Sequence, residues 1–93
     1  MKEKSVNGWI SLELHFQLEA HCKRLGLSKS TFIRTIILDR IKDNYFVLGG
    51  GDTGVFDCAI TAWIDEDSKA ILKANVDNIS GWLRESIYDE LNS

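Results

Sequence analysis

An internal repeat is the feature that most constrains the fold of this 93-residue chain. When the sequence is shifted by 50 positions, residues 1–43 align with residues 51–93 without a gap, and seven positions are identical. The identical pairs are Ile10/Ile60, Ala20/Ala70, Lys23/Lys73, Ser30/Ser80, Arg34/Arg84, Ile37/Ile87 and Asp39/Asp89. These matches fall mainly at core and cap positions of one pattern, so we expect two copies of one small structural unit.

The first repeat begins with a strand pattern and continues with a helix pattern. Apolar or small residues at positions 6, 8 and 10 alternate with Ser5, Asn7 and Trp9, which predicts a short strand. Ser11 can then cap a helix whose apolar side chains recur at helical spacing, at Leu14, Leu18, Cys22 and Leu25. Gly26 is expected to end this helix in the left-handed conformation.

A second helix follows at once, and its pattern is the clearest in the chain. Ser28 is its expected N-cap, and the helix should run from about Lys29 to Lys42. One face carries the apolar side chains Phe32, Ile33, Ile36, Ile37 and Ile41.

The second repeat reads in the same way, with Thr61 as the expected cap of its first helix and Asp77 or Asn78 as the cap of its last. A slipped register is also open, because residues 10–14 and 58–64 alternate well enough to be strands. In that version the first helices begin near His15 and Asp65 and lose about one turn. We therefore expect three regions: repeat one (1–43), a glycine-rich linker (44–54) and repeat two (55–93). The run from Tyr45 to Leu48 is apolar, and it suits either a strand or a cover over the edge of the core.

The formal charge of −3 is distributed unevenly between the repeats. Residues 1–50 hold eight basic and five acidic side chains, which gives +3, whereas residues 51–93 hold three basic and nine acidic ones, which gives −6. Asymmetry of this kind predicts different partners for the two ends.

Composition argues against several other classes of protein. The two cysteines, Cys22 and Cys58, lie in apolar patterns that suit reduced, buried thiols, and with His15 and His21 they show no metal-ligand spacing. We expect no cofactor and no metal. No nucleophile, base and orienting group recur at a recognisable spacing, so we expect no enzyme activity. The amino terminus is polar and no apolar stretch has bilayer length, which predicts a cytoplasmic protein without a membrane partner.

The stretch from Val6 to Lys42 resembles the ribbon-helix-helix repressors, the family of the Arc and methionine repressors. The features that carry the resemblance are the short strand, the capped helix, the turn from Gly26 to Ser30 and the amphipathic second helix. The resemblance implies a mainly α fold with a short antiparallel β-ribbon, built here from two tandem units that share one core as a pseudo-dimer. We expect a monomer with internal pseudo-symmetry that associates further on DNA, although pairing between two chains also remains open.

The resemblance also implies roles for particular residues. The ribbon of this family lies in the major groove of DNA, so the outward side chains Ser5, Asn7 and Trp9 would face base edges. Asn7 is the best base reader, because its amide can form two hydrogen bonds with adenine. Backbone amides at Ser28, Lys29 and Ser30 would hold a phosphate, and Lys2 and Lys4 would add positive charge.

Each of these residues also has a purely structural interpretation. Ser28 can be only an N-cap, Asn7 a solvated strand residue, and Trp9 a side chain half-buried against a neighbour. The basic residues Lys29, Arg34 and Arg40 can form an ordinary solvated helix face.

The second repeat departs from the family pattern. At the shift of 50 its ribbon positions are Val55, Asp57 and Ala59, and Asp77 occupies the expected anion site. The leading prediction is a DNA-binding transcriptional regulator that reads double-stranded DNA through repeat one. The rival is a protein-binding module, antitoxin-like or inhibitory, that uses the acidic residues Asp57, Asp65, Glu66 and Asp67. The last three of these can instead simply favour a helix start.

Overall fold

The computed structural model describes residues 2–46 and 55–92, and these residues form two strands and four helices. Along the chain the elements are β1 (Glu3–Ser11), α1 (Leu12–Leu25), α2 (Lys29–Lys42), β2 (Phe56–Asp65), α3 (Glu66–Asn75) and α4 (Ile79–Asn92). The described part of the chain is therefore mostly helical with a short antiparallel sheet, as the sequence predicts. We call residues 2–46 the first half and residues 55–92 the second half; both have the order strand, helix, helix.

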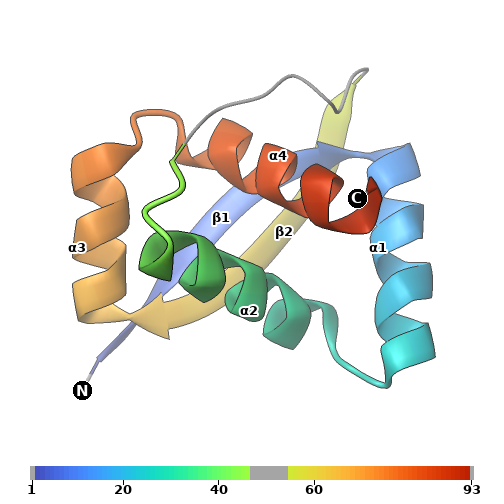
Figure 1. Cartoon of the computed structure of the whole chain (residues 1–93). Helices are drawn as coiled ribbons and strands as arrows, with labels where there is room; N and C mark the ends of the chain where they lie inside the picture. The colour runs from blue at the N-terminus through green and yellow to red at the C-terminus, as the bar shows by residue number, and fades with distance from the viewer. Residues whose placement is uncertain (1, 47–54, 93) are drawn as a thin grey trace.

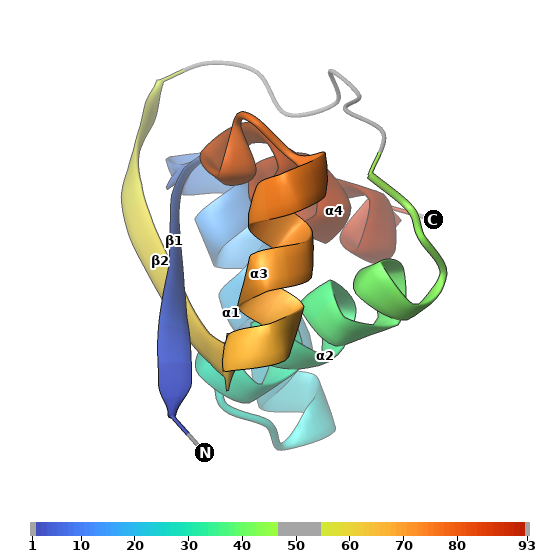
Figure 2. The same cartoon turned by 90° about the vertical axis from the view of Figure 1, so that its left-hand side faces the viewer.

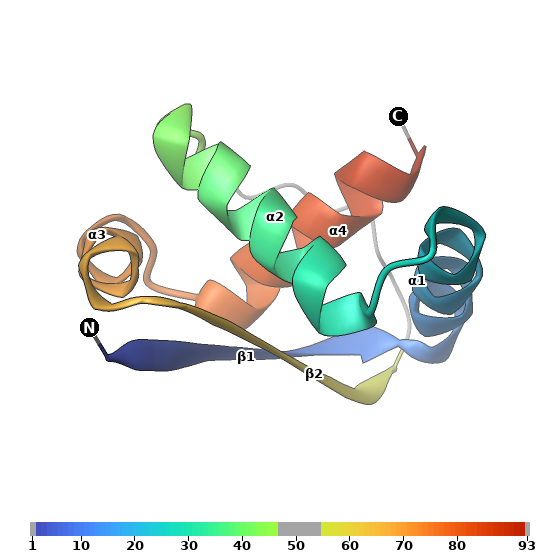
Figure 3. The ribbon, with the colours of Figure 1, turned by 90° about the horizontal axis from the view of Figure 1, so that it is seen from below.

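The two strands pair antiparallel and form a two-stranded ribbon, with Asn7 opposite Thr61. One set of alternate residues is buried: Val6, Gly8 and Ile10 from β1, and Ile60, Ala62 and Ile64 from β2. Because alternate residues of a strand point to opposite faces, these six form the inner face of the ribbon. All four helices lie on that side, and no described element covers the other side (Figure 3). The same two-layer arrangement is visible from the end of the molecule (Figure 2).

β1 passes directly into α1, as the first of the two registers predicts. Ser11 has extended backbone angles and its hydroxyl accepts a hydrogen bond from the amide of Leu14, which is the geometry of an N-cap. The slipped register, with a helix starting near His15, is wrong for this half. Gly26 ends α1 with a φ of 71°, a left-handed conformation that glycine adopts without strain.

In the second half the slipped register is the right one. Thr61 does not cap a helix; it lies inside β2, which continues to Asp65. Asp65 caps α3 instead, since its carboxylate accepts a hydrogen bond from the amide of Ser68 at 2.9 Å. α3 consequently has 10 residues where α1 has 14. The physical reason is pairing: Trp63, Ile64 and Asp65 lie opposite Ser5, Lys4 and Glu3, so the ladder of β1 keeps this segment extended.

The second helix of each half begins where the sequence predicts. Ser28 caps α2 by accepting a hydrogen bond from the amide of Thr31, and α2 has the predicted bounds Lys29–Lys42. Of the two candidate caps of α4, Asn78 takes the role, because its Oδ1 accepts a hydrogen bond from the amide of Gly81 at 2.9 Å. α2 and α4 pack against each other across the inner face of the ribbon (Figure 1).

The buried residues form one cluster to which all six elements contribute. The halves interlock, because α4 packs mainly on β1 and α2 mainly on β2. A Cβ added at Gly8 would lie 3.3 Å from Cδ2 of Leu83, so α4 packs tightly on β1 at this glycine. The amide of Trp9 donates a hydrogen bond to Oγ of Ser80, which anchors the start of α4 on the strand. Neither half has a core of its own.

Residues just after α2 cover one edge of this core. The indole of Trp82, fully buried, donates a hydrogen bond to the carbonyl oxygen of Tyr45 at 3.1 Å, and Phe46 packs on the core beside it. This favours the covering role for the start of the apolar run at 45–48; residues 47 and 48, like the glycines at 49–51 and 54, lie outside the described residues. Cys22 is buried and Cys58 is half-buried, and both are free thiols.

Candidate nucleic-acid interface

The outer face of the ribbon is a strip of six side chains that point away from the core. β1 contributes Ser5, Asn7 and Trp9, as predicted, and β2 contributes Ala59, Thr61 and Trp63. Ser5 is half-buried and the other five are exposed. We call these six residues the outer strip. Its members carry no formal charge.

The centre of the outer strip is a small polar network. Thr61 Oγ1 donates a hydrogen bond to Oδ1 of Asn7 at 2.8 Å, and Nδ2 of Asn7 donates to Oγ of Ser5 at 3.2 Å. These two bonds fix the orientation of the Asn7 amide. An amide nitrogen carries two N–H groups, so the network leaves donor capacity on Asn7 that faces solvent.

Two tryptophans flank this network. Trp9 lies opposite Ala59 and Trp63 lies opposite Ser5, so each indole has a small cross-strand neighbour. Their exposed fractions are nearly equal, 51 % for Trp9 and 50 % for Trp63. Trp9 therefore points outward from the ribbon, and about half of its surface is covered. Both interpretations of Trp9, as an outward residue and as a half-buried one, hold in part. Large apolar side chains this exposed at matched positions are typical of contact surfaces.

The second-half members of this face differ from those predicted at the shift of 50. The counterpart of Asn7 across the ladder is Thr61, so the prediction that Asp57 takes this place is wrong. Asp57 lies near the start of β2, beside the irregularity where Ile10 pairs with Cys58 and Ser11 with Phe56, and its Oδ1 accepts a hydrogen bond from Sγ of Cys58. Val55 precedes the strand. The centre of the ribbon is thus free of the carboxylate that would repel phosphate.

The sequence did hold a signal for the correct register. At a shift of 54 the inner residues Val6, Gly8 and Ile10 match Ile60, Ala62 and Ile64, and Trp9 matches Trp63. The caps Ser11 and Asp65 also match at 54, whereas Ser28 and Asn78 match at 50. A single offset for the whole chain therefore cannot align both regions, because α3 is one turn shorter than α1.

A group of lysines lies where β1 begins. Lys2 and Lys4, the lysines predicted to add positive charge toward DNA, are exposed. Lys69 of α3, which the sequence did not single out, donates a hydrogen bond from Nζ to the carbonyl oxygen of Ser5 at 2.7 Å. Burial lowers the pKa of Lys69, and the nearby charge of Lys73 adds to the effect. Lys4, Lys69 and Lys73 also line a surface cavity of about 240 Å³ with Glu66 and Ala70. The acidic half thus supplies positive charge beside β1.

The start of α2 has the geometry of a simple cap with a lysine next to it. Besides the amide of Thr31, the hydroxyl of Ser28 contacts Oγ1 of Thr31 at 2.8 Å. Nζ of Lys29 lies 3.3 Å from Nε2 of His15 and 3.9 Å from a carboxylate oxygen of Glu19. Ser30 is exposed. An incoming phosphate would therefore compete with Glu19 for Lys29. At the start of α4, Asp77 is exposed beside the cap Asn78, so that end lacks the lysine and carries a carboxylate.

The four acidic residues of the rival prediction do not gather into one surface. Asp57 lies near the start of β2 and Asp65 at its end, eight residues apart, or about 26 Å along a strand. Hydrogen bonds from the hydroxyl and amide of Ser68 lower the pKa of Asp65, which is consistent with its work as a cap. Glu66 and Asp67 are exposed in the first turn of α3, where negative charge is favourable.

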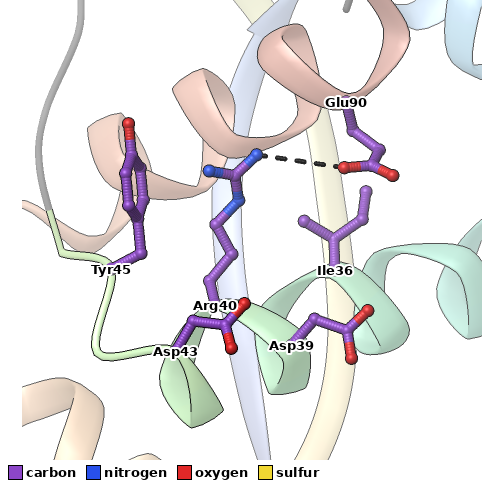
Figure 4. Close-up of a pocket in the computed structure, with 6 residues that line it drawn as sticks. All are labelled: Ile36, Asp39, Arg40, Asp43, Tyr45 and Glu90. Carbon is purple, nitrogen blue, oxygen red and sulfur yellow. Dashed lines mark ion pairs between the residues drawn. The ribbon is translucent and has the colours of Figure 1, made fainter.

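A second cavity, of about 300 Å³, lies between the C-terminal parts of α2 and α4 (Figure 4). Its lining residues are Ile36, Asp39, Arg40, Asp43, Tyr45 and Glu90. Arg40 occupies its middle: the guanidinium stacks 4.9 Å from the Tyr45 ring, donates to the carbonyl oxygen of Ser86 and lies 3.9 Å from Glu90. Arg40 is therefore engaged within the protein rather than part of a solvated helix face.

Within residues 2–46 and 55–92 there is no cluster of side chains suited to a metal ion, and none of the helices is long and apolar enough to span a bilayer. No family model, curated protein or solved structure matches the chain.

Proposed function

We propose that this chain is a DNA-binding regulator of the ribbon-helix-helix type, in which two tandem units share one core and act as a pseudo-dimer. Its function would be to place the ribbon of β1 and β2 in the major groove of double-stranded DNA. The observation that carries the proposal is the outer strip: an uncovered ribbon face whose centre presents the hydrogen-bonding side chains Asn7 and Thr61.

The dimensions of the ribbon support this occupant. The major groove of B-form DNA is about 12 Å wide and admits a two-stranded ribbon, whereas the minor groove is about half that width. Neighbouring strands lie about 4.8 Å apart, so two strands with their side chains fill such a groove. Asn7 is suited to adenine, and Thr61 to either a hydrogen-bonding base edge or a thymine methyl group.

Electrostatics sets a limit on the affinity. Attraction to phosphate must come from local basic groups, because the chain as a whole has a charge of −3. The candidates are Lys2 and Lys4 at the start of β1, Lys69 beside Ser5, and Lys29 at the start of α2. Each phosphate contact changes the slope of log K against log salt by about −0.9. Four such contacts predict a slope of about −3.6, which is modest for a DNA-binding protein.

The test is a titration of mixed duplex DNA at low salt that is repeated as the salt concentration rises. Wild type should bind with a measurable salt slope. Lys29→Ala should reduce that slope by about one, while Lys42→Ala, at the other end of α2 and about 20 Å away, should leave it unchanged. Asn7→Ala should weaken binding to a preferred sequence without changing the slope. The proposal fails if the folded protein binds no duplex at low salt.

A second candidate function is a protein-binding module, antitoxin-like or inhibitory, that uses the acidic second half. The observation that favours it is the pair Glu66 and Asp67, which are exposed at the start of α3 and make no described ion pair. Under this function a Glu66→Gln, Asp67→Asn variant would keep the fold and lose the partner, and duplex DNA would not bind either protein. Light scattering adds an independent measurement, because a chain that closes its own ribbon should be monomeric without DNA.

A further inference from the structure

The two edges of the outer strip differ in chemistry although the ribbon places them symmetrically. Since the strands are antiparallel and Asn7 pairs with Thr61, a two-fold axis between these residues relates β1 to β2. The axis exchanges Trp9 with Trp63, Ser5 with Ala59, and Asn7 with Thr61. Only the tryptophans are identical, so two of the three related positions offer different groups to a ligand.

These differences bear directly on base recognition. An asparagine amide offers a donor and an acceptor together and pairs with adenine, whereas a threonine offers one hydroxyl and a methyl group. Ser5 can donate or accept a hydrogen bond, and Ala59 can do neither. The hydrogen bond from Thr61 Oγ1 to Asn7 Oδ1 holds the two central side chains in one relative orientation. The two strands therefore present different hydrogen-bonding groups to a ligand, whereas a ribbon of two identical chains would present the same groups twice.

The first turns of α2 and α4, which lie beneath the ribbon, also differ in chemistry. The start of α2 presents Ser28 and Lys29, while the start of α4 presents Asp77 and Asn78. Positive charge thus accompanies one end of the ribbon's helix pair and negative charge the other. On a duplex, whose two flanks are equally charged, the two ends would not be equivalent.

We infer that the DNA site of this protein is non-palindromic and is bound in one orientation, with Asn7 and Thr61 as the residues that set the direction at its centre. This inference rests on the proposed DNA-binding function and adds the class of site to it. A dimer of identical chains reads an inverted repeat because it presents the same side chains twice. A single chain that presents unlike side chains reads two unlike half-sites.

The first experiment is selection of bound duplexes from a random pool with the full chain, followed by sequencing. The inference predicts one enriched motif without an inverted repeat. An enriched palindrome would overturn the inference and leave the DNA-binding function intact. If no sequence is enriched and no duplex binds at low salt, the function itself fails. The two failures are therefore distinguishable.

The second experiment uses the exposed central pair, whose substitution leaves the core untouched. In the exchange variant Asn7→Thr, Thr61→Asn, the preferred bases at the two central positions should exchange, and affinity for the wild-type site should fall by about 5- to 150-fold. The matched control is Asn7→Thr alone, which places threonine on both strands and should make the two central positions equivalent. Circular dichroism melting checks that each variant is folded. Unchanged base preferences in the exchange variant would contradict the inference.

Discussion

The first half and the second half of this molecule build the same order of elements with different residues. Ser11 and Ser28 cap the helices of the first half, while Asp65 and Asn78 cap those of the second. Gly26 ends α1 in the left-handed conformation, whereas Val76 ends α3 with an extended backbone. The comparison teaches that an N-cap requires a side-chain oxygen at the right place and not a particular residue type. The two halves can therefore differ in their cap residues and still share one pattern of buried positions.

The halves also differ at a matched pair of buried aromatic side chains, Phe32 of α2 and Trp82 of α4. Trp82 is fully buried, and its counterpart Phe32 is smaller and 7 % exposed. We predict that Trp82→Ala lowers the free energy of unfolding by about 4–5 kcal/mol and Phe32→Ala by about 3 kcal/mol. Trp82→Ala removes more apolar volume and also the hydrogen bond to Tyr45.

Chemical denaturation followed by circular dichroism measures both losses. If Trp82→Ala does not fold at all, Trp82→Phe and Phe32→Leu provide the same comparison with smaller changes. Equal losses in the two halves would show that the pair is energetically symmetric.

The next largest effect is expected where α4 crosses β1. Gly8 and its counterpart Ala62 are both buried, and a Cβ added at Gly8 would lie 3.3 Å from Cδ2 of Leu83 on α4. Gly8→Val should lower the free energy of unfolding by about 1–3 kcal/mol through overpacking. Ala59→Val, on the exposed face of the same ribbon, is the control and should cost nothing measurable. A Gly8→Val protein as stable as wild type would refute the close packing.

Two arginines at matched positions of α2 and α4 make contacts of different kinds. Arg84 stacks 3.7 Å from the Phe56 ring and donates a hydrogen bond to the carbonyl oxygen of Trp9, while Arg34 forms an ion pair with the exposed Glu3 at 3.5 Å. Arg84→Ala should cost about 1–2 kcal/mol of stability and Arg34→Ala less than about 0.5 kcal/mol. Thermal melting of the two variants at equal salt tests the difference, and the opposite order would contradict it.

The smallest expected effect concerns the caps of α1 and α3. The stability that the two caps contribute should depend on pH in the second half and not in the first. Ser11→Ala should cost about 1 kcal/mol at every pH, since a hydroxyl cap does not titrate in this range. Because the pKa of Asp65 is lowered in the folded protein, its contribution is present above the unfolded pKa and is lost as the pH falls through the folded one. Asp65→Ser keeps a cap and removes this dependence.

Urea denaturation between neutral and acid pH measures both variants. The stability difference between wild type and Asp65→Ser should shrink as the pH falls through the acid range. A difference that stays constant with pH would mean that the Asp65 carboxylate gives α3 no more than a neutral cap gives.

Much of the fold was predictable because its signals are local. α2 was predicted with its observed bounds, since the Ser28 cap and the apolar residues at positions 32, 33, 36, 37 and 41 act within one helix. The outward residues of β1 were predicted for the same reason: period-2 alternation is written in adjacent positions. The candidate site was half predicted, because β1 carries one edge of the outer strip and β2 the other.

The prediction of the β2 edge of the outer strip failed because the sequence did not settle where β2 ends. Thr61 and Asp65 are both good helix caps, and the segment between them suits a strand or a first helical turn. From that ambiguity followed the wrong ribbon positions Val55 and Asp57, and the omission of Thr61, Trp63 and Lys69.

By itself the sequence determined the number of elements, their order, the second helix of each half and the inner face of β1, because each depends on side chains a few positions apart. Only the tertiary structure decided where β2 ends, since Trp63, Ile64 and Asp65 stay extended through backbone hydrogen bonds with residues some 60 positions away. Local preference was nearly balanced there, and a partner strand that supplies donors and acceptors tips such a balance. Because β2 continues four residues past Thr61, to Asp65, Thr61 and not Asp57 lies opposite Asn7.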